Sequence, residues 1–236
     1  VDIDGAVDMA STLQVDGALT GSSTIYGVGI NVIETGSILI SNDGTTGTIS
    51  AAVRNTGLGF EVFDDLTTGD DNTSMGRRSL TKVTTGSGNT AMGSGSIELL
   101  TTGDSNTAFG VSSLYATTTG ANNTAVGNSA LTANTTGTFN VAVGANALDA
   151  NTTASYNVGV GINALGATTT GANNSAFGTA SLDANTTGGN NTGVGYDALG
   201  ANTTAANNTA VGYQALLLNT TGTQNVAVGS ASLDAN

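Results

Sequence analysis

The sequence predicts an all-β protein, a parallel β-solenoid (or β-roll) in which coils of 17 residues stack along one axis. Ten consecutive repeats of 17 residues fill positions 67–236 without insertion or deletion, and each opens with Thr-Thr. A short, fixed period indicates stacked identical units. Gly contributes 35 of the 236 residues, and charged residues only 9%. β-Branched residues and Gly recur throughout without an apolar stripe of helical period, which argues against helices.

Three positions of the repeat, counted from its first Thr, form columns when coils are stacked. Position 6 is always Asn, and we expect its side-chain amides to form a ladder. Position 10 is always Gly, which we expect at a tight turn or at a close approach of two backbones. Position 14 is Leu or Ile, and we expect it to form an apolar core ridge. The Asn column is Asn72, Asn89, Asn106, Asn123, Asn140, Asn157, Asn174, Asn191, Asn208 and Asn225. The Gly column is Gly76, Gly93, Gly110, Gly127, Gly144, Gly161, Gly178, Gly195, Gly212 and Gly229. The aliphatic column is Leu80, Ile97, Leu114, Leu131, Leu148, Leu165, Leu182, Leu199, Leu216 and Leu233.

Each coil is expected to hold two short strands. In the repeat 118–134, residues 123–127 alternate larger and smaller side chains, as a strand does. Thr124 and Val126 are expected on one face, and Ala125 and Gly127 on the other. Residues 130–132 are expected to form the second strand.

The chain divides into three parts. Residues 1–49 form an irregular, β-rich shaft or adaptor segment, with short strands expected at 25–30 and 37–40 and a turn at 41–44. Residues 50–66 form a degenerate first repeat. Residues 67–236 form the ten-repeat β-roll. The sequence starts without Met and stops at the end of a repeat, so we expect a segment of a longer protein.

A roll this thin is expected to need partners of its own kind. Each coil offers only about two sizeable apolar side chains to a core, and such small cores are marginal. The small face made by Ala125, Gly127 and their equivalents is expected to allow close contact with another chain. We therefore expect a parallel bundle of identical rolls.

Charge and composition exclude several functions. The net charge is −13, and from residue 83 onward there is no Lys or Arg, which argues against nucleic acid and anionic membranes as partners. The chain has no Cys and no His, so catalytic triads built on them and most transition-metal sites are excluded. No run is long enough to span a membrane. We expect no enzyme activity, no catalytic residue, no cofactor and no metal.

The carboxylates and basic residues of the chain give only weak indications of a binding site. Asp2, Asp4 and Asp8 are close in sequence, and Asp70 and Asp71 share a turn, but the ligand set of an EF-hand is incomplete. Solvated turn residues are the favoured interpretation. Asp149, Asp183 and Asp234 share one repeat position, which other repeats fill differently. The basic cluster, Arg77, Arg78 and Lys82, lies near several carboxylates and is interpreted as local charge balance.

Two recurrent polar patterns have a structural and a functional interpretation. Regular Thr arrays on a flat solenoid can match ice, but here the Thr-Thr pairs adjoin Gly and are interpreted as turns. Asn-x-Thr sequons recur, and turn chemistry is favoured over glycosylation. These sequons include Asn134, Asn151, Asn185, Asn202 and Asn219.

The strand motif resembles the head repeat of YadA-like trimeric autotransporter adhesins. Residues 140–144, 157–161 and 225–229 follow the pattern Asn-Val-Ala/Gly-Val-Gly. In that family the repeat builds a left-handed parallel β-roll, and three rolls pack side by side around an axis. Similar repeats occur in viral tail and head fibres. The period of 17 is longer than the usual adhesin repeat, and no basic neck, heptad stalk or membrane anchor is present. The opening 1–8 resembles Asp-Gly-rich shaft segments of marine phage fibres.

The resemblance implies a structural and adhesive viral fibre protein: a homotrimeric, elongated shaft of a phage tail or virion that presents a host-attachment surface. The expected partners are two further copies of the chain, other virion or fibre proteins, and a host cell-surface receptor. The expected location is extracellular, at the virion surface. A bacterial surface adhesin head, at the cell surface, is the first alternative. An ice-binding solenoid is the second.

Overall fold

The computed structural model describes residues 23–25, 28–33, 37–41 and 52–234. Within these residues the fold is all-β: a parallel β-solenoid with a 17-residue coil, as the sequence predicts. Asp2, Asp4, Asp8 and the rest of the turn expected after Ser41 lie outside the described residues. In the described part of the chain, no helix is long and apolar enough to cross a membrane.

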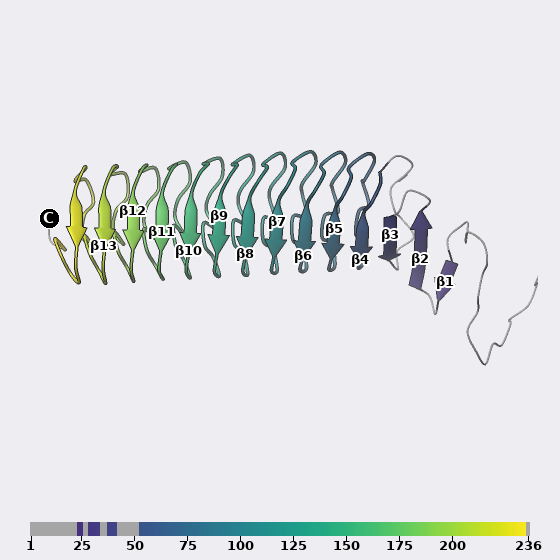
Figure 1. The fold of residues 1–236 in the computed structure, drawn as a ribbon, viewed down its shortest axis with the longest axis horizontal. Coiled ribbons are helices and arrows are strands. Elements are labelled where there is room, and N and C mark those ends of the chain that lie inside the picture. The colour runs from purple at the N-terminus through teal and green to yellow at the C-terminus, as the bar shows by residue number, and fades with distance from the viewer. Residues whose placement is uncertain (1–22, 26–27, 34–36, 42–51, 235–236) are drawn as a thin grey trace, which may run out of the picture.

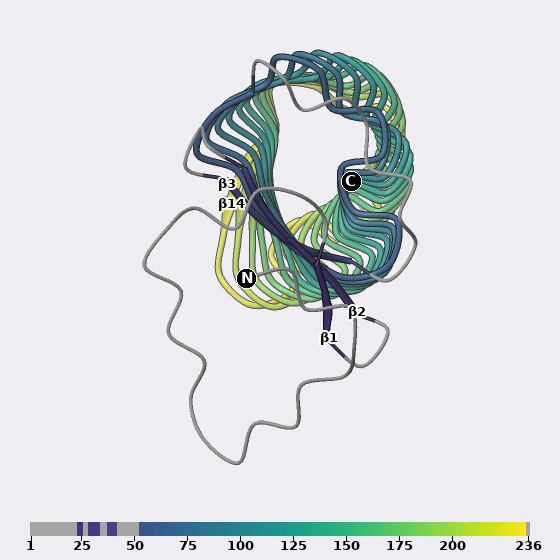
Figure 2. The ribbon, with the colours of Figure 1, turned by 90° about the vertical axis from the view of Figure 1, so that its right-hand side faces the viewer.

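Fourteen strands form one sheet in strict sequence order. Figure 1 shows β4 to β14 side by side in one row, and Figure 2, seen along the stack, shows the coils superposed in one closed outline. From β3 onward every neighbouring pair is parallel, and from β4 onward each residue pairs with the one 17 positions later, as Val141 does with Val158. The eleven coil strands are β4 (Thr56–Leu58), β5 (Thr73–Met75), β6 (Thr90–Met92), β7 (Thr107–Phe109), β8 (Thr124–Val126), β9 (Val141–Val143), β10 (Val158–Val160), β11 (Ser175–Phe177), β12 (Thr192–Val194), β13 (Thr209–Val211) and β14 (Val226–Val228).

The N-terminal part differs from the array. β1 (Ser23–Ile25) pairs antiparallel with β2 (Val28–Ile33), and β2 pairs antiparallel with β3 (Ser37–Ser41). The single strand expected at 25–30 is therefore wrong, because two antiparallel strands occupy this stretch. β3 then pairs in parallel with β4, which joins this part to the first coil.

Each described coil has one strand of three residues, so the second expected strand is wrong. In the repeat 118–134 the residues after Val126 form turns. The reason is the backbone at positions 12 and 14: Ser129 has φ 56° and Leu131 has φ 52°, both left-handed rather than extended. Residues with a Cβ avoid this region at a cost of about 1–2 kcal/mol. The aliphatic column accepts it because the turn carries Leu80 through Leu216 into the core. Leu233 was also expected in the core ridge, but it is 51% exposed because no further described coil covers the last one.

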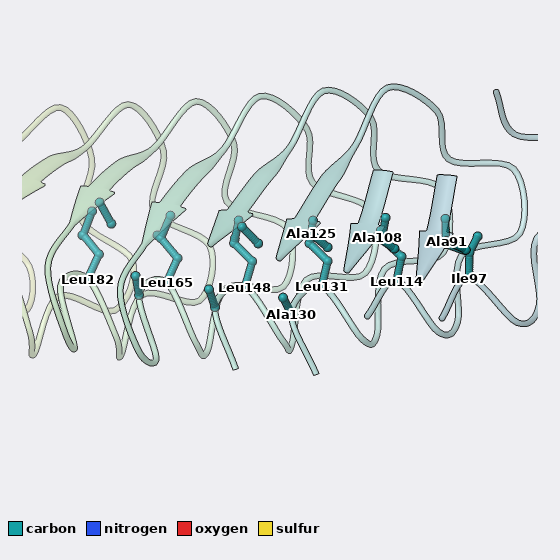
Figure 3. Close-up of a cluster of buried hydrophobic side chains, with 14 of the residues drawn as sticks. Ala91, Ile97, Ala108, Leu114, Ala125, Ala130, Leu131, Leu148, Leu165 and Leu182 are labelled. Atoms are coloured by element: carbon teal, nitrogen blue, oxygen red, sulfur yellow. The ribbon is translucent and has the colours of Figure 1, made fainter. Parts of the chain in front are cut away.

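The core lies between the strand and the leucine column (Figure 3). Ala125, in the middle of its strand, is completely buried, and so is Leu131. In the coil of β10 the strand holds Gly159, and a Cβ built there would lie 3.4 Å from the side chain of Leu148. In this part of the array the interior therefore has room for one large side chain per coil, opposite a small one. In the first coils Leu66, Val83 and Leu100 are buried in addition. The expected role of Ala125 as a contact to another chain is wrong, because this side chain faces inward.

Candidate interaction surface

The asparagines of position 6 form a continuous ladder, which is buried from Asn72 to Asn208. The backbone N–H of each one, from Asn72 to Asn225, donates to the side-chain Oδ1 of the asparagine one coil earlier, as Asn140 does to Asn123 at 3.0 Å. The side-chain Nδ2 donates to the position-3 carbonyl of the next coil, at 2.8 Å between Asn140 and Ala154. Direct amide-to-amide bonds also occur, at 3.2 Å from Asn140 Nδ2 to Asn123 Oδ1. Each amide thus satisfies the polar backbone groups of a bend that is closed to water.

Sequence analysis missed a second amide column, at position 17. Leu66, Val83 and Leu100 fill this position first, and amides with two threonines follow. Asn151 Nδ2 donates to Asn134 Oδ1 at 2.9 Å and to the Ala154 carbonyl at 3.2 Å. The buried asparagines of this column are Asn134, Asn151, Asn185, Asn202 and Asn219. They are the sequon asparagines named above, and a glycan has no access to them in the folded coil.

The first threonine of each repeat forms a hydroxyl ladder. Thr135 Oγ1 donates to the Thr152 carbonyl at 2.9 Å, and the same bond recurs from Thr67 through Thr186. These hydroxyls are committed to the backbone of the next coil. The second threonine is exposed in every repeat, so only one hydroxyl of each Thr-Thr pair in this ladder is left to face solvent.

The glycines of position 10 lie where adjacent coils touch. Gly144 has φ 134°, and a Cβ built on it would lie 2.5 Å from the Gly161 carbonyl oxygen. Gly76 to Gly212 share this geometry, with φ between 134° and 140°. The close approach is therefore between coils of one chain.

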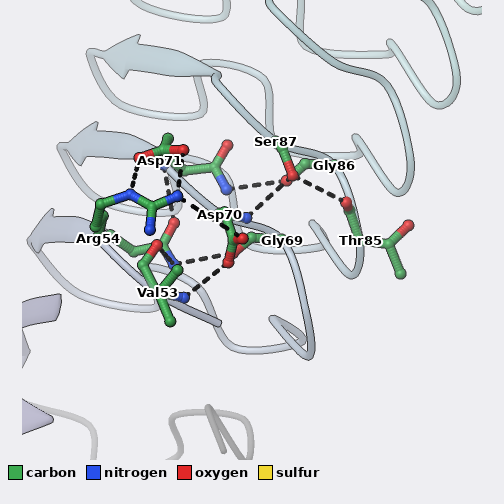
Figure 4. A network of polar contacts seen from close by, with 10 residues as sticks. Val53, Arg54, Gly69, Asp70, Asp71, Thr85, Gly86 and Ser87 are labelled. Atoms are coloured by element: carbon green, nitrogen blue, oxygen red, sulfur yellow. Dashed lines mark hydrogen bonds and ion pairs between the residues drawn. The ribbon is translucent and has the colours of Figure 1, made fainter. Parts of the chain in front are cut away.

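The charged residues at the start of the array form ion pairs and hydrogen bonds between neighbouring coils. Arg54 pairs with Asp71, at 2.6 Å from Nε to Oδ1, while Asp70 Oδ1 accepts the Val53 N–H at 2.8 Å (Figure 4). The Arg54 guanidinium lowers the pKa of the Asp71 carboxyl. Asp70 N–H in turn donates to Ser87 Oγ at 3.0 Å. The two aspartates are thus engaged by protein groups, which suits stacking rather than ion binding.

The basic cluster also serves coil stacking. Arg78 bridges Glu61 of the coil before and Glu98 of the coil after, at 2.9 and 2.7 Å. Lys82 pairs with Asp65 of the coil before at 3.1 Å. Glu98 is almost fully buried, and its carboxylate pairs with Arg78.

Two aspartates of position 15, Asp149 and Asp183, lie close to each other across Gly166. A Cβ on Gly166 would lie 2.6 Å from Asp183 Oδ1 and 3.7 Å from Asp149 Oδ1, so both carboxylates lean over this glycine. Partial burial raises the pKa of Asp183, and the charges of Asp149 and Asp197 raise it further. Burial also raises the pKa of Asp149. Within the described residues no group of three acidic, His or Cys side chains has the arrangement of a metal site.

Replacing Asp183 with Asn should stabilise the array at neutral pH. A carboxyl whose pKa is raised by folding stabilises most below its unfolded pKa, about 3.9, and loses that contribution as pH rises through the folded value. We expect the variant to melt higher than the natural chain at pH 7, by less than about 3 °C because the groups are partly solvated. The difference should vanish near pH 3. Equal melting temperatures across this range, measured by circular dichroism, would contradict the repulsion.

The outer face of the sheet is the remaining distinctive surface. We define the apolar ridge as the position-9 column, whose side chains point away from the core. Most of its members expose large apolar groups; Met75 is 44% and Phe177 is 44% exposed. Its residues are Leu58, Met75, Met92, Phe109, Val126, Val143, Val160, Phe177, Val194, Val211 and Val228. A contiguous apolar surface of this length is unusual for an isolated protein and indicates an interaction site.

Comparison of the chain with family models, with curated proteins and with solved structures gives no match. The candidate site therefore rests on geometry alone: an uninterrupted apolar ridge on a regular sheet. Its repeating contacts suit an extended partner that lies along the array.

Proposed function

We propose that this chain is a structural and adhesive fibre protein, the homotrimeric shaft of a phage tail or virion fibre. The single observation that carries the proposal is the apolar ridge, which runs along all eleven coils and faces outward. Three identical rolls laid side by side in parallel remove such ridges from water together. Burial of apolar area contributes about 25 cal/mol per Å².

The distribution of charge supports assembly through this side. The chain has a net charge of −13, so copies repel one another on average. Positions 5, 7 and 11 flank the apolar ridge and are exposed or partly exposed in every described coil, so positions 5, 7, 9 and 11 form the outward positions of the repeat. After Asp71 and Arg77, these outward positions carry no charged residue in the described coils. The carboxylates beyond this point lie at positions 4, 12 and 15, for example Asp104, Asp197 and Asp183. Copies meet with least repulsion at the outer face.

The interior ladders support a mechanical role. Amide and strand hydrogen bonds link every described coil to the next, and hydroxyl bonds add to them from Thr67 through Thr186, so bending or opening the stack breaks several bonds at once. A rod of eleven coils spaced by about 4.8 Å extends roughly 50 Å. Attachment through a fibre uses avidity from several chains rather than one deep pocket.

Immunogold labelling tests the location. Antibodies against residues 67–236 would be applied to virus particles and to cells from the source culture. Label on particle surfaces is the expected result. Label confined to the bacterial envelope would overturn the viral assignment and favour the adhesin head.

A freezing assay tests the ice-binding alternative. The hydroxyl of the first threonine in each pair, from Thr67 through Thr186, is bonded to the backbone of the next coil. The two parallel rows of free threonine hydroxyls that would bind ice are therefore not both present. We expect no thermal hysteresis from the purified chain. A clear hysteresis would instead place the exposed threonines of position 2 on ice.

A further inference from the structure

One short stretch of the outer face differs from the rest. In the repeats 135–151 and 152–168 all four outward positions are apolar, whereas every other coil has a polar or charged residue, or a glycine, at one or more of them. We define the central patch as these eight residues: Phe139, Val141, Val143, Ala145, Tyr156, Val158, Val160 and Ile162. Phe139 and Tyr156 stack with their ring centroids 5.2 Å apart, and both rings are about half exposed.

The two aromatic rings are poorly suited to the coil that holds them. Phe139 has φ 57° and Tyr156 has φ 63°. Neighbouring coils place Asn122 and Asn173 at this bend, and Asn tolerates the left-handed region far better than bulky residues do. Since the coil itself is served better by Asn, and the rings are not buried in it, the rings fit a role outside the coil.

The apolar ridge alone leaves the alignment of two copies undefined. Six of its eleven residues are Val, including Val126, Val143 and Val160 on three successive coils. Sliding one copy past another by one coil therefore again brings Val onto Val. Repetitive sheets of this kind have weakly specified register.

We infer that the central patch sets the register between copies of this chain, by packing against the same patches of the neighbouring copies in the bundle at zero offset. The inference rests on the proposed parallel bundle. A shift of one coil towards the C-terminus would place the ring of Tyr156 at the level of Asn173 and Val158 at the level of Ser175. These apolar side chains would then pack against polar ones. Only zero offset pairs all eight residues with their own kind.

The available area fits a second copy. Eleven coils of about 4.8 Å and a face of about four residues at about 3.3 Å give roughly 650–700 Å² per copy. Standard protein interfaces bury about 600–1,000 Å² per partner, and the outer face reaches the lower part of this range. The outer face is therefore large enough for a specific contact of a second copy along its whole length.

Disulfide mapping tests the register, because the natural chain contains no Cys. Each variant would carry a single cysteine, and two variants with cysteines at the same repeat position on adjacent coils would form a matched pair. The three pairs are Val141→Cys with Val158→Cys, Val143→Cys with Val160→Cys, and Ala145→Cys with Ile162→Cys. The two members of a pair, one of them isotope-labelled, would be unfolded together, refolded, oxidised and analysed by mass spectrometry. We expect at least one column to form disulfides between equal positions, with mixed disulfides less than a tenth as abundant.

The control variant is Phe139→Asn with Tyr156→Asn, which copies the residue found at this bend in neighbouring coils. The melting temperature of the folded coils should be no lower in this variant than in the natural chain. The mixed disulfides should become at least five times more abundant. Abundant mixed disulfides in the natural background, or no increase in the variant, would overturn the inference. An oligomer that forms no disulfide in any of the three columns would also overturn it, while leaving the proposed fibre intact. A monomer by light scattering would overturn both.

Discussion

Replacing Gly144 with alanine should destabilise the array by about 3–5 kcal/mol, more than most substitutions of a single surface residue. Two costs combine. The backbone at Gly144 has φ 134°, which residues with a Cβ rarely adopt, and the new Cβ would lie 2.5 Å from the Gly161 oxygen and 2.6 Å from its carbonyl carbon. These atoms are backbone, so relief requires the two coils to separate. Chemical unfolding followed by circular dichroism measures the loss, and valine should be worse.

Gly229 provides the matched control. Its φ is 125°, but the nearest atom that a new Cβ would meet is the Ser232 Cβ at 3.9 Å. Gly229→Ala should therefore show the backbone strain without the clash and cost about 1–3 kcal/mol. If Gly144→Ala unfolded at the same denaturant concentration as the natural chain, the close approach of coils would be refuted.

Replacing Asn140 with aspartate, a change of nearly identical shape, should cost about 3–5 kcal/mol at pH 7. The Oδ1 atom can still accept the Asn157 N–H, which lies at 3.0 Å. The second carboxylate oxygen, however, replaces an amide nitrogen that donates to the Ala154 carbonyl at 2.8 Å and to Asn123 Oδ1 at 3.2 Å. Acceptor would face acceptor, and the charge would be buried without a cation.

The pH dependence identifies the cause. Burial would raise the pKa of the new carboxyl, so the loss should be full above the folded pKa and should shrink as pH falls towards the unfolded value of about 3.9. Asn122→Asp, at the preceding exposed position of the adjacent coil, is the control and should cost less than about 0.5 kcal/mol. An Asn140→Asp variant as stable as this control at pH 7 would show that the ladder is dispensable.

Sequence analysis predicted the solenoid and its period because the same residues recur at fixed spacing, and stacking places each residue upon its own kind. The columns at positions 6, 10 and 14 were visible for that reason. The structure places Asn140 in a buried ladder, Gly144 at a contact between coils, and Leu148 in the core.

Conformation was harder to predict than contact. Leu131 and its equivalents were expected in a strand, since an aliphatic residue between small ones is typical of strands. Burial of one large side chain in a narrow interior instead holds them in a left-handed turn, against their intrinsic preference. The assignment of the two strand faces was also wrong. The narrow core accepts Ala125, which was expected to face another chain, and the larger Val126 points outward.

The amide column at position 17 was missed because its chemistry changes along the chain. Leu100 is followed by Thr117 and then by Asn134, so no single residue type marks the column. The signal was present in the repeated Asn-Thr-Thr triplet, which was explained as a turn. A tabulation of the residue types at each repeat position would have revealed the recurrent Asn at position 17.

The most direct measurement of the central claim is the absolute mass of the purified chain by light scattering. One chain has a mass of 22.9 kDa, and copies joined through the outer face should form a particle of three chains with a β spectrum. We expect this mass to persist on dilution into the micromolar range. A folded particle of one chain would contradict it, because the apolar ridge would then remain in water along the entire array.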